Sequence, residues 1–348
     1  MTTMTGRPAL ALAGAALLLG TLTACGGSAG TPAAGDPPTK IQFTAGFAPN
    51  ATTTNIVAGV DQGFFAKQGL DVGLITPANA ADATKLLTGG SVQFAVINSF
   101  NQIIAKSQGV GLVSVAATVQ NANHGIMSRA DAPITDPKQL EGKTVGMTGF
   151  VGNKVMLKDI LRRHGADPDK VKLVDVNLNG PALLAQKKVD ALGDAIDYNV
   201  PTSYNQAIHK PLDDKSSYTF LPFHDLGMFP YELANIAVSQ DYAQAHPDLV
   251  RRFLTAWQQA TQWSIDHPEE AVAGTVKRYP NLNQATVLAQ WRVLAPQIQS
   301  PDTAAHGLGW QTPSKWSSID ELFTTAGVTK HSADLNALVN NTFLPAKP

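Results

Sequence analysis

Short segments that are apolar on both faces recur along the chain, and they constrain its fold more than any other feature. Residues 92–97 and 112–119 are nearly continuous apolar runs, and helical patterns separate such runs from one another. A strand with two apolar faces must be covered on both sides, which is the arrangement of parallel sheets enclosed by helices. The sequence therefore predicts an α/β fold with buried sheets.

This pattern occurs twice, which predicts two lobes. A first block covers residues 41–133 and a second covers 134–224, with the proline-containing segment 133–137 at their boundary. Residues 225–348 begin with a strand at 233–238 and are otherwise mostly helical. Because single hydrophobic cores stop growing near ~250–300 residues, a chain of 348 residues favours two lobes. We expect the last portion to return to lobe I and a ligand cleft to lie between the lobes.

The first 24 residues indicate export from the cytoplasm. A single arginine precedes the apolar run 9–19, which is too short to span a hydrocarbon core of ~30 Å as a helix. Leu-Thr-Ala-Cys at 22–25 resembles the lipobox of bacterial lipoproteins, and Cys25 is the only cysteine in the chain. Residues 25–40 have the composition of a flexible tether. We expect a signal peptide over 1–24, lipidation of Cys25, and a protein anchored to the cell membrane outside the cytoplasm. An ordinary secretory signal with an incidental cysteine is the alternative.

The composition argues against several functional classes. The 26 Lys and Arg residues balance 27 Asp and Glu residues, so the chain has no basic field that would attract nucleic acid. One cysteine excludes a disulfide framework and a multi-cysteine metal site, and no two of the eight histidines are four residues apart. The motifs G-x-S-x-G and H-E-x-x-H do not occur, and Pro137 stands where a phosphate-binding loop ending at 142–144 would need glycine. We expect no cofactor, no metal, no nucleic-acid partner and no enzymatic activity.

Two segments resemble a known group of proteins. Residues 63–72 (GFFAKQGLDV) are similar to a G-(Y/F)-F-x-x-x-G-L-(D/E)-V signature, and residues 87–95 (LTGGSVQFA) are similar to L-x-x-G-x-x-D-F-A, with Gln93 in place of the acid. Both belong to solute-binding proteins of ABC importers, in the group for nitrate, sulfonate, taurine and thiamine-pyrimidine precursors. The resemblance covers about residues 41–330. It implies a two-lobed periplasmic-binding-protein-like fold of type II, a small-molecule ligand and an ABC permease as partner.

Within that group, the chain most resembles the binding proteins for pyrimidine precursors of thiamine. The resemblance rests on Pro49-Asn50 and on residues 229–233 (FPYEL). These binding proteins are related in fold to the fungal thiamine-pyrimidine synthases, which depend on a cysteine cluster that this chain lacks. Phe47 stands where the subgroup commonly has tryptophan, and Ala51-Thr52-Thr53 replaces its usual Thr-Asn-His. The resemblance implies a heteroaromatic ligand that can differ from that of the subgroup.

The candidate ligand-binding residues lie near the ends of predicted strands, where open α/β sheets bind ligands. With the resemblance, Glu232 is the first candidate, since a carboxylate can accept N–H bonds from an aminopyrimidine edge or hold an ammonium group. Aromatic rings would stack on a flat heterocycle, and asparagine amides would supply hydrogen bonds. A core role for the rings, a turn role for the amides and a solvated loop position for Glu232 are the alternatives. The candidates are Phe47, Asn50, Asn98, Phe150, Tyr198, Asn199, Tyr231 and Glu232.

Together these features predict a monomeric, lipid-anchored solute receptor whose lobes close on a ligand and deliver it to an ABC permease. One alternative keeps this class and changes the ligand to nitrate or a taurine-like sulfonate. The sulfonate would then lie at the strand-to-helix turn 149–153 and the ammonium group would lie against Glu232. A second alternative is an exported enzyme of pyrimidine salvage.

Overall fold

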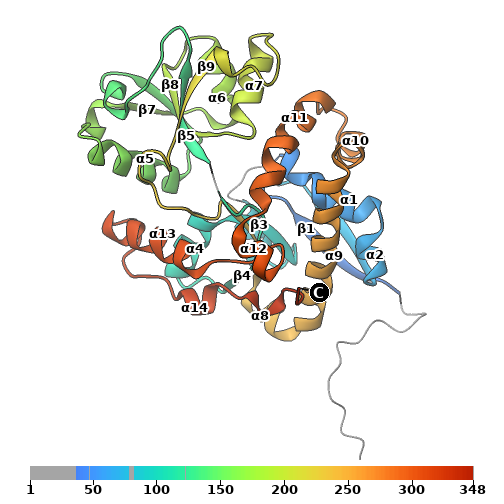
Figure 1. The fold of residues 1–348 in the computed structure, drawn as a ribbon. Coiled ribbons are helices and arrows are strands. Elements are labelled where there is room, and N and C mark those ends of the chain that lie inside the picture. Colours follow the sequence, from blue (N-terminus) through green and yellow to red (C-terminus); the bar gives the residue numbers. More distant parts are fainter. Residues whose placement is uncertain (1–36, 47, 78–81, 122, 348) are drawn as a thin grey trace, which may run out of the picture. The chain divides into compact units, whose positions relative to one another are not determined.

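The computed structural model describes residues 37–347 apart from residues 47, 78–81 and 122. The predicted signal peptide, Cys25, most of the predicted tether and Phe47 therefore lie outside the described residues. The described chain forms two five-stranded sheets, each with helices packed against it (Figure 1). None of its helices combines the length and the apolar character needed to cross a bilayer.

The first sheet has the strand order β2-β1-β3-β10-β4. Its strands are β1 (Thr39–Thr44), β2 (Leu70–Ile75), β3 (Phe94–Asn98), β4 (Leu112–Ala117) and β10 (Ala234–Ser239). β1 runs parallel to β2 and β3, whereas β10 is antiparallel to both β3 and β4. Every residue of β4 is buried, as its continuous apolar pattern predicts.

The second sheet has the order β7-β6-β8-β5-β9. Its strands are β5 (His124–Arg129), β6 (Thr144–Met147), β7 (Lys172–Asp175), β8 (Ala191–Ile196) and β9 (Tyr218–Pro222). β6 runs parallel to β7 and β8, and β5 is antiparallel to β8 and β9. Both sheets are therefore mixed rather than purely parallel.

The first crossing between the sheets differs from the prediction. We expected lobe I to extend to residue 133, but β5 already pairs with β8 and β9 in the second sheet. The chain therefore crosses between Ala117, where β4 ends, and His124, where β5 begins. The segment 124–129 (HGIMSR) has no regular alternation of apolar and polar residues, because small and polar side chains fill buried positions on it. The second crossing lies between β9 and β10, close to the predicted boundary at 224.

Helices cover both sheets. Those that follow the strands of the first sheet are α1 (Thr54–Asp61), α2 (Phe64–Lys67), α3 (Asp82–Thr88) and α4 (Ser99–Ser107). Those between strands of the second sheet are α5 (Val151–Arg163), α6 (Gly180–Ala185) and α7 (Val200–Ala207). After β10 the chain forms α8 (Gln240–Ala245), α9 (Pro247–Asp266), α10 (Pro268–Arg278), α11 (Gln284–Leu294), α12 (Pro301–His306), α13 (Pro313–Thr325) and α14 (Leu335–Leu338).

Helix α9 packs its apolar stripe on the first sheet. It begins at Pro247, whose fixed φ suits the first helical position. Phe253 is fully buried and stacks on Phe94 of β3, with ring centroids 3.8 Å apart and an interplanar angle of 11°. The ring also lies 5.9 Å from that of Phe43 on β1. The C-terminal helices thus complete the core of the lobe in which the chain began.

A large hydrophobic cluster joins the two lobes beside the crossings. It contains Phe100 of α4, Leu157 of α5 and Phe323 of α13. The two lobes pack tightly at Gly152, where an added Cβ would lie 2.7 Å from a ring atom of Phe100. Glycine at 152 therefore allows the start of α5 to rest on α4. The lobes share a core at this point.

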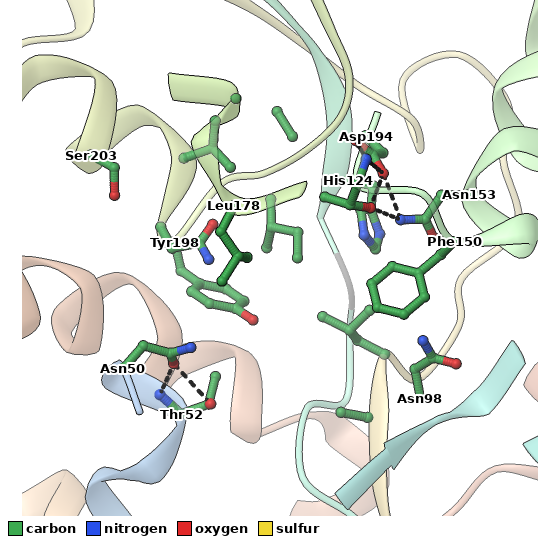
Figure 2. Close-up of a pocket in the computed structure, with 18 of the residues that line it drawn as sticks. Asn50, Thr52, Asn98, His124, Phe150, Asn153, Leu178, Asp194, Tyr198 and Ser203 are labelled. Atoms are coloured by element: carbon green, nitrogen blue, oxygen red, sulfur yellow. Dashed lines mark hydrogen bonds between the residues drawn. The ribbon is translucent and has the colours of Figure 1, made fainter. Parts of the chain in front are cut away.

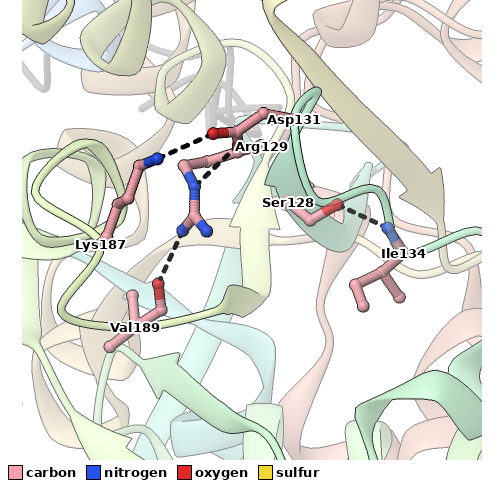
Figure 3. A network of polar contacts seen from close by, with 6 residues as sticks. All are labelled: Ser128, Arg129, Asp131, Ile134, Lys187 and Val189. Carbon is pink, nitrogen blue, oxygen red and sulfur yellow. Dashed lines mark hydrogen bonds and ion pairs between the residues drawn. The ribbon is translucent and has the colours of Figure 1, made fainter.

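A surface network closes the turn after β5 (Figure 3). Asp131 binds Arg129 at 3.1 Å and Lys187 at 2.9 Å. The Arg129 guanidinium also donates to the backbone oxygen of Val189 at 3.2 Å. These contacts connect the end of β5 with the segment that leads into β8, and so hold together the two strands that carry part of the pocket described next.

Candidate functional site

A cavity of about 270 Å³ lies between the two sheets, and residues of both lobes line it. Figure 2 shows Asn50, Thr52 and Asn98 from the first lobe, with Leu178, Tyr198 and Ser203 among those from the second. Its volume is just below the ~300–1,000 Å³ that is usual for small-molecule sites. The cavity suits a small ligand.

The structure brings most of the predicted site residues to this cavity. Those that line it are Asn50, Asn98, Phe150, Tyr198 and Asn199. Phe47 lies outside the described residues. Tyr231 and Glu232 are described but are not among the lining residues, and both are treated below.

Asn50 and Asn98 each cap a helix while lining the cavity. The Asn50 Oδ1 accepts from the backbone nitrogen and from the hydroxyl of Thr52, both at 2.8 Å. The Asn98 Oδ1 accepts from the backbone nitrogen of Asn101 at 2.7 Å, at the start of α4. The Asn50 amide nitrogen also donates to the backbone oxygen of Ala48 at 3.2 Å, which uses one of its two hydrogens. Each side chain therefore keeps at least one amide N–H for a ligand while its oxygen serves the cap.

Tyr198 and Phe150 supply the aromatic surface. Their rings lie on different sides of the drawn pocket (Figure 2). Tyr198 is buried, and its burial, with the charge of neighbouring Asp197, raises the pKa of the phenol well above its usual value. Leu178 is 68% exposed although it lines the cavity, which places it at the rim.

Glu232 requires a correction, because its carboxylate binds the protein rather than facing the cavity. The side chain is 1% exposed. Its oxygens accept from the backbone nitrogen of Thr312 at 2.7 Å, from the indole nitrogen of Trp316 at 2.9 Å and from the amide of Asn235 at 3.1 Å. Burial raises its pKa to about 7 despite these bonds. The adjacent Leu233 lines the cavity instead.

Tyr231 requires the same correction, since it lies behind the cavity wall. Its ring packs on that of Phe100, with centroids 5.3 Å apart. Its hydroxyl is hydrogen-bonded to Nδ1 of His124, and His124 itself lines the cavity. Tyr231 therefore supports a lining residue instead of stacking on the ligand.

Among the lining residues that were not predicted, His124 and Asp194 are the two with ionisable side chains. His124 begins β5, a strand that the sequence pattern did not reveal. Asp194 lies inside the apolar strand β8, and a lone carboxylate in an otherwise apolar strand was the signal that could have identified it. Burial lowers the pKa of His124 to about 3, so its ring is neutral at physiological pH.

Asp194 is 3% exposed and accepts hydrogen bonds from two neighbours. The backbone nitrogen of Thr148 lies 3.2 Å from Oδ1 and 3.0 Å from Oδ2, and the Thr148 hydroxyl also donates to Oδ2. The amide of Asn153 donates to Oδ2 at 2.8 Å. Burial raises the pKa of Asp194, and these bonds oppose the rise. Among the described residues that line the cavity, Asp194 is the one carboxylate, and none is a lysine or arginine.

Comparison with known proteins identifies relatives of two kinds. A family model described as NMT1/THI5 like matches residues 50–271. A formylaminopyrimidine-binding protein of Halalkalibacterium halodurans is 28% identical over 64% of this chain. The match covers 66% of that protein, so the chain spans just under two thirds of the relative's length. A 4-amino-5-hydroxymethyl-2-methylpyrimidine phosphate synthase of Saccharomyces cerevisiae is 24% identical over 73% of this chain and 75% of that protein.

A solved structure establishes the fold. The periplasmic aliphatic sulphonate binding protein SsuA of Escherichia coli superposes with a TM-score of 0.64 at 15% identity, over 86% of this chain and 96% of that protein. The predicted two-lobed periplasmic-binding-protein fold of type II is therefore confirmed. At this identity the likeness concerns the fold and says nothing of the ligand.

Proposed function

The chain belongs to the NMT1/THI5-like family, and we propose on that premise that it is the solute-binding component of an ABC importer, which captures a small heteroaromatic ligand between its lobes. The relative that binds formylaminopyrimidine and the likeness in fold to a periplasmic sulphonate-binding protein support this class. Such a protein acts outside the cytoplasm and passes its ligand to a permease.

The chemistry of the cavity wall carries the choice of ligand. Tyr198 and Phe150 provide aromatic faces, and Asn98 and Asn50 provide amide nitrogens. Stacking on an aromatic ring contributes ~1–3 kcal/mol for a base-like ring. A neutral planar ring that carries a few hydrogen-bonding groups fits this wall.

The same wall disfavours the sulfonate and nitrate alternatives. The described lining residues include no lysine or arginine, and burial keeps the His124 ring neutral. Asp194 already accepts the bonds from Thr148 and Asn153 beside the start of α5, where an oxyanion would need those donors. An oxyanion next to this carboxyl group would be repelled. Glu232, which the taurine hypothesis needed for the ammonium group, does not line the cavity.

A binding role is favoured over an enzymatic one. Relatives named as synthases share the family. The resemblance implies that such synthases depend on a cysteine cluster. This chain has one cysteine, Cys25, and therefore no such cluster. We propose that the chain binds its ligand without converting it. Release of unchanged ligand after denaturation of the complex, measured by mass spectrometry, is the expected result, and a converted product would refute it.

Ligand capture would proceed by closure of the lobes. The cavity is lined from both lobes, so the ligand gains its full set of contacts only when they are together, and its differential affinity shifts the equilibrium toward the closed state. Helix α11, which follows the first sheet in the chain, contacts α7 of the second lobe. There Gln290 donates to Ser203 at 3.3 Å and the Thr286 hydroxyl donates to Gln206 at 3.2 Å. These bonds would break on opening, whereas the shared core at Phe100 and Gly152 would remain as the hinge side.

Membrane attachment is proposed from the lipobox-like segment at 22–25. Lipidation of Cys25 would anchor a monomeric protein by its N-terminus outside the cytoplasm. Cys25→Ser should move the expressed protein from the membrane fraction to the soluble exported fraction, and a variant that stays with the membrane would contradict the anchor.

A thermal-shift panel of aminopyrimidines, taurine and nitrate tests the ligand class. A ligand at about 100 times its dissociation constant adds ~2.7 kcal/mol of stability. We expect an aminopyrimidine to raise the melting temperature and Tyr198→Ala to reduce that shift, with Tyr204→Ala as the control because Tyr204 is buried in the same lobe but does not line the cavity. A shift with taurine alone would refute the pyrimidine proposal.

A further inference from the structure

His124 presents a hydrogen-bond donor to the cavity, and Tyr231 determines which nitrogen carries the hydrogen. The ring is 1% exposed, lines the cavity, and contacts the Tyr231 hydroxyl through Nδ1. The backbone N–H of His124 also bonds to the phenol oxygen, and this group can only donate, so Nδ1 is the partner that can accept the hydroxyl hydrogen. The hydroxyl hydrogen must therefore go to Nδ1, because a buried donor without an acceptor is costly.

This arrangement determines the tautomer of the imidazole. A neutral imidazole has one nitrogen that donates and one that accepts. Since Nδ1 accepts from Tyr231, the hydrogen of His124 is on Nε2, which points away from Nδ1 and has no partner within the described chain. The low pKa of His124 keeps the ring in this neutral form. His124 thus offers one N–H donor of fixed direction.

Asp194 offers an acceptor on the strand next to the one that carries this donor. It lies on β8, which pairs directly with the β5 strand that carries His124. Figure 2 shows both side chains at the same end of the pocket. Oδ2 accepts from the amide of Asn153 and from both donors of Thr148. Oδ1 receives only a share of the Thr148 backbone bond, at 3.2 Å, so it retains capacity for another donor.

A donor beside an acceptor matches one type of ligand edge. The ligand must carry an acceptor next to a donor in one plane, as a ring nitrogen does beside a carbon that bears an amino group. Resting on the proposed function, we propose that His124 and Asp194 are specificity-determining residues that bind this edge of an aminopyrimidine. The His124 Nε2–H donates to the ring nitrogen, and Asp194 Oδ1 accepts from the amino group. Tyr231 is a positioning residue for His124.

The first test compares two ligands that differ only at the amino group. Titration calorimetry of the purified full-length protein would use 4-amino-2-methylpyrimidine and 2,4-dimethylpyrimidine. The amino compound should bind at least about 10-fold more tightly, because its N–H bond to a buried carboxylate is lost in the methyl compound. Equal binding would overturn the inference and leave the proposed function standing. If no aminopyrimidine binds, the proposed function fails, and the inference that rests on it fails too.

The second test exchanges the acceptor. In Asp194→Asn the amide oxygen can keep the bonds from Thr148 and Asn153, while the amide N–H₂ would face the ligand's amino group as donor against donor. Affinity for the amino compound should fall by about 10- to 100-fold, and affinity for the dimethyl compound should change by less than about 3-fold. Asp320→Asn is the matched control, since Asp320 is also buried, accepts a backbone bond from Ala333 at 2.9 Å, and does not line the cavity. An unchanged preference in Asp194→Asn would overturn the assignment. If that variant does not fold, the comparison of the two ligands on the unmodified protein still decides.

The third test reads the tautomer directly. Nitrogen NMR of the His124 ring should show hydrogen on Nε2 and none on Nδ1, and Tyr231→Phe should introduce the other tautomer. The same variant should weaken both pyrimidines by a similar factor, because both carry the ring nitrogen. A ring with its hydrogen on Nδ1 in the unmodified protein would overturn the inference.

Discussion

Replacement of Glu232 by glutamine separates a structural role from a ligand-binding role. The carboxyl group is almost fully buried among donors from Thr312, Trp316 and Asn235, and burial raises its pKa from 4.5 to about 7. A raised pKa means that the folded state holds the proton more tightly than the unfolded state. The stability contributed by this group is therefore fully present below pH 4.5 and is lost as the pH rises through about 7.

The magnitude follows from the shift. Since one pKa unit is worth a little over 1 kcal/mol, a rise from 4.5 to about 7 corresponds to about 3 kcal/mol, most of which falls between pH 5 and pH 8. Glutamine does not titrate, so Glu232→Gln should lack this part of the pH dependence. The amide N–H₂ of glutamine would also face N–H groups that now donate to the carboxylate. This contact of donor with donor should lower stability by about 1–3 kcal/mol at all pH values.

The assay is urea unfolding of the protein and the Glu232→Gln variant at pH 5 and pH 8. The difference in unfolding free energy between them should change by about 2–3 kcal/mol over this interval, with the unmodified protein relatively more stable at pH 5. Glu269→Gln is the control, because Glu269 is exposed and pairs with Arg292 on the surface. A difference that does not vary with pH would refute the reasoning. The ligand affinity of Glu232→Gln should remain within about 3-fold of the unmodified protein. A loss of affinity would show that Glu232 takes part in ligand binding after all.

Two further predictions concern the hinge side and the aromatic wall. Gly152→Val should destabilise the fold by about 1–3 kcal/mol in urea unfolding, because the new side chain would overlap the ring of Phe100, and wild-type stability would contradict the close packing at this point. Tyr198→Ala should weaken ligand binding by about 10-fold or more in calorimetry through lost stacking, while Tyr198→Phe should bind within about 3-fold, and equal losses in both variants would show that the hydroxyl matters rather than the ring.

The strands and helices with strong periodicity were predictable, whereas the crossing between lobes was not. The apolar runs of β3, β4 and β8 and the stripe of α9 carry their own signal. β5 carries none, since Gly125 and Ser128 occupy buried positions where their small size, not their hydrophobicity, suits the sheet. Its place between β8 and β9 depends on partners distant in sequence, which local pattern cannot specify.

The site was predictable to the level of strand ends but not of side-chain faces. Asn98, Asn199 and Tyr198 lie where the ends of strands predicted a ligand. Leu233 lines the cavity, whereas the neighbouring Glu232 points into the protein and binds Trp316. Successive side chains of an extended segment point to opposite faces, so an error of one residue selects the wrong side chain.

The apolar cluster that joins Phe100, Leu157 and Phe323 also bears on attempts to divide the protein. A fragment that contains only residues 119–232 would leave Leu157 and its neighbours without the partners from α4 and α13, and would present them to water. Such a fragment should aggregate rather than fold alone. Biosensors built on this scaffold therefore need both lobes in one polypeptide, with reporter groups attached to exposed loops away from this apolar cluster.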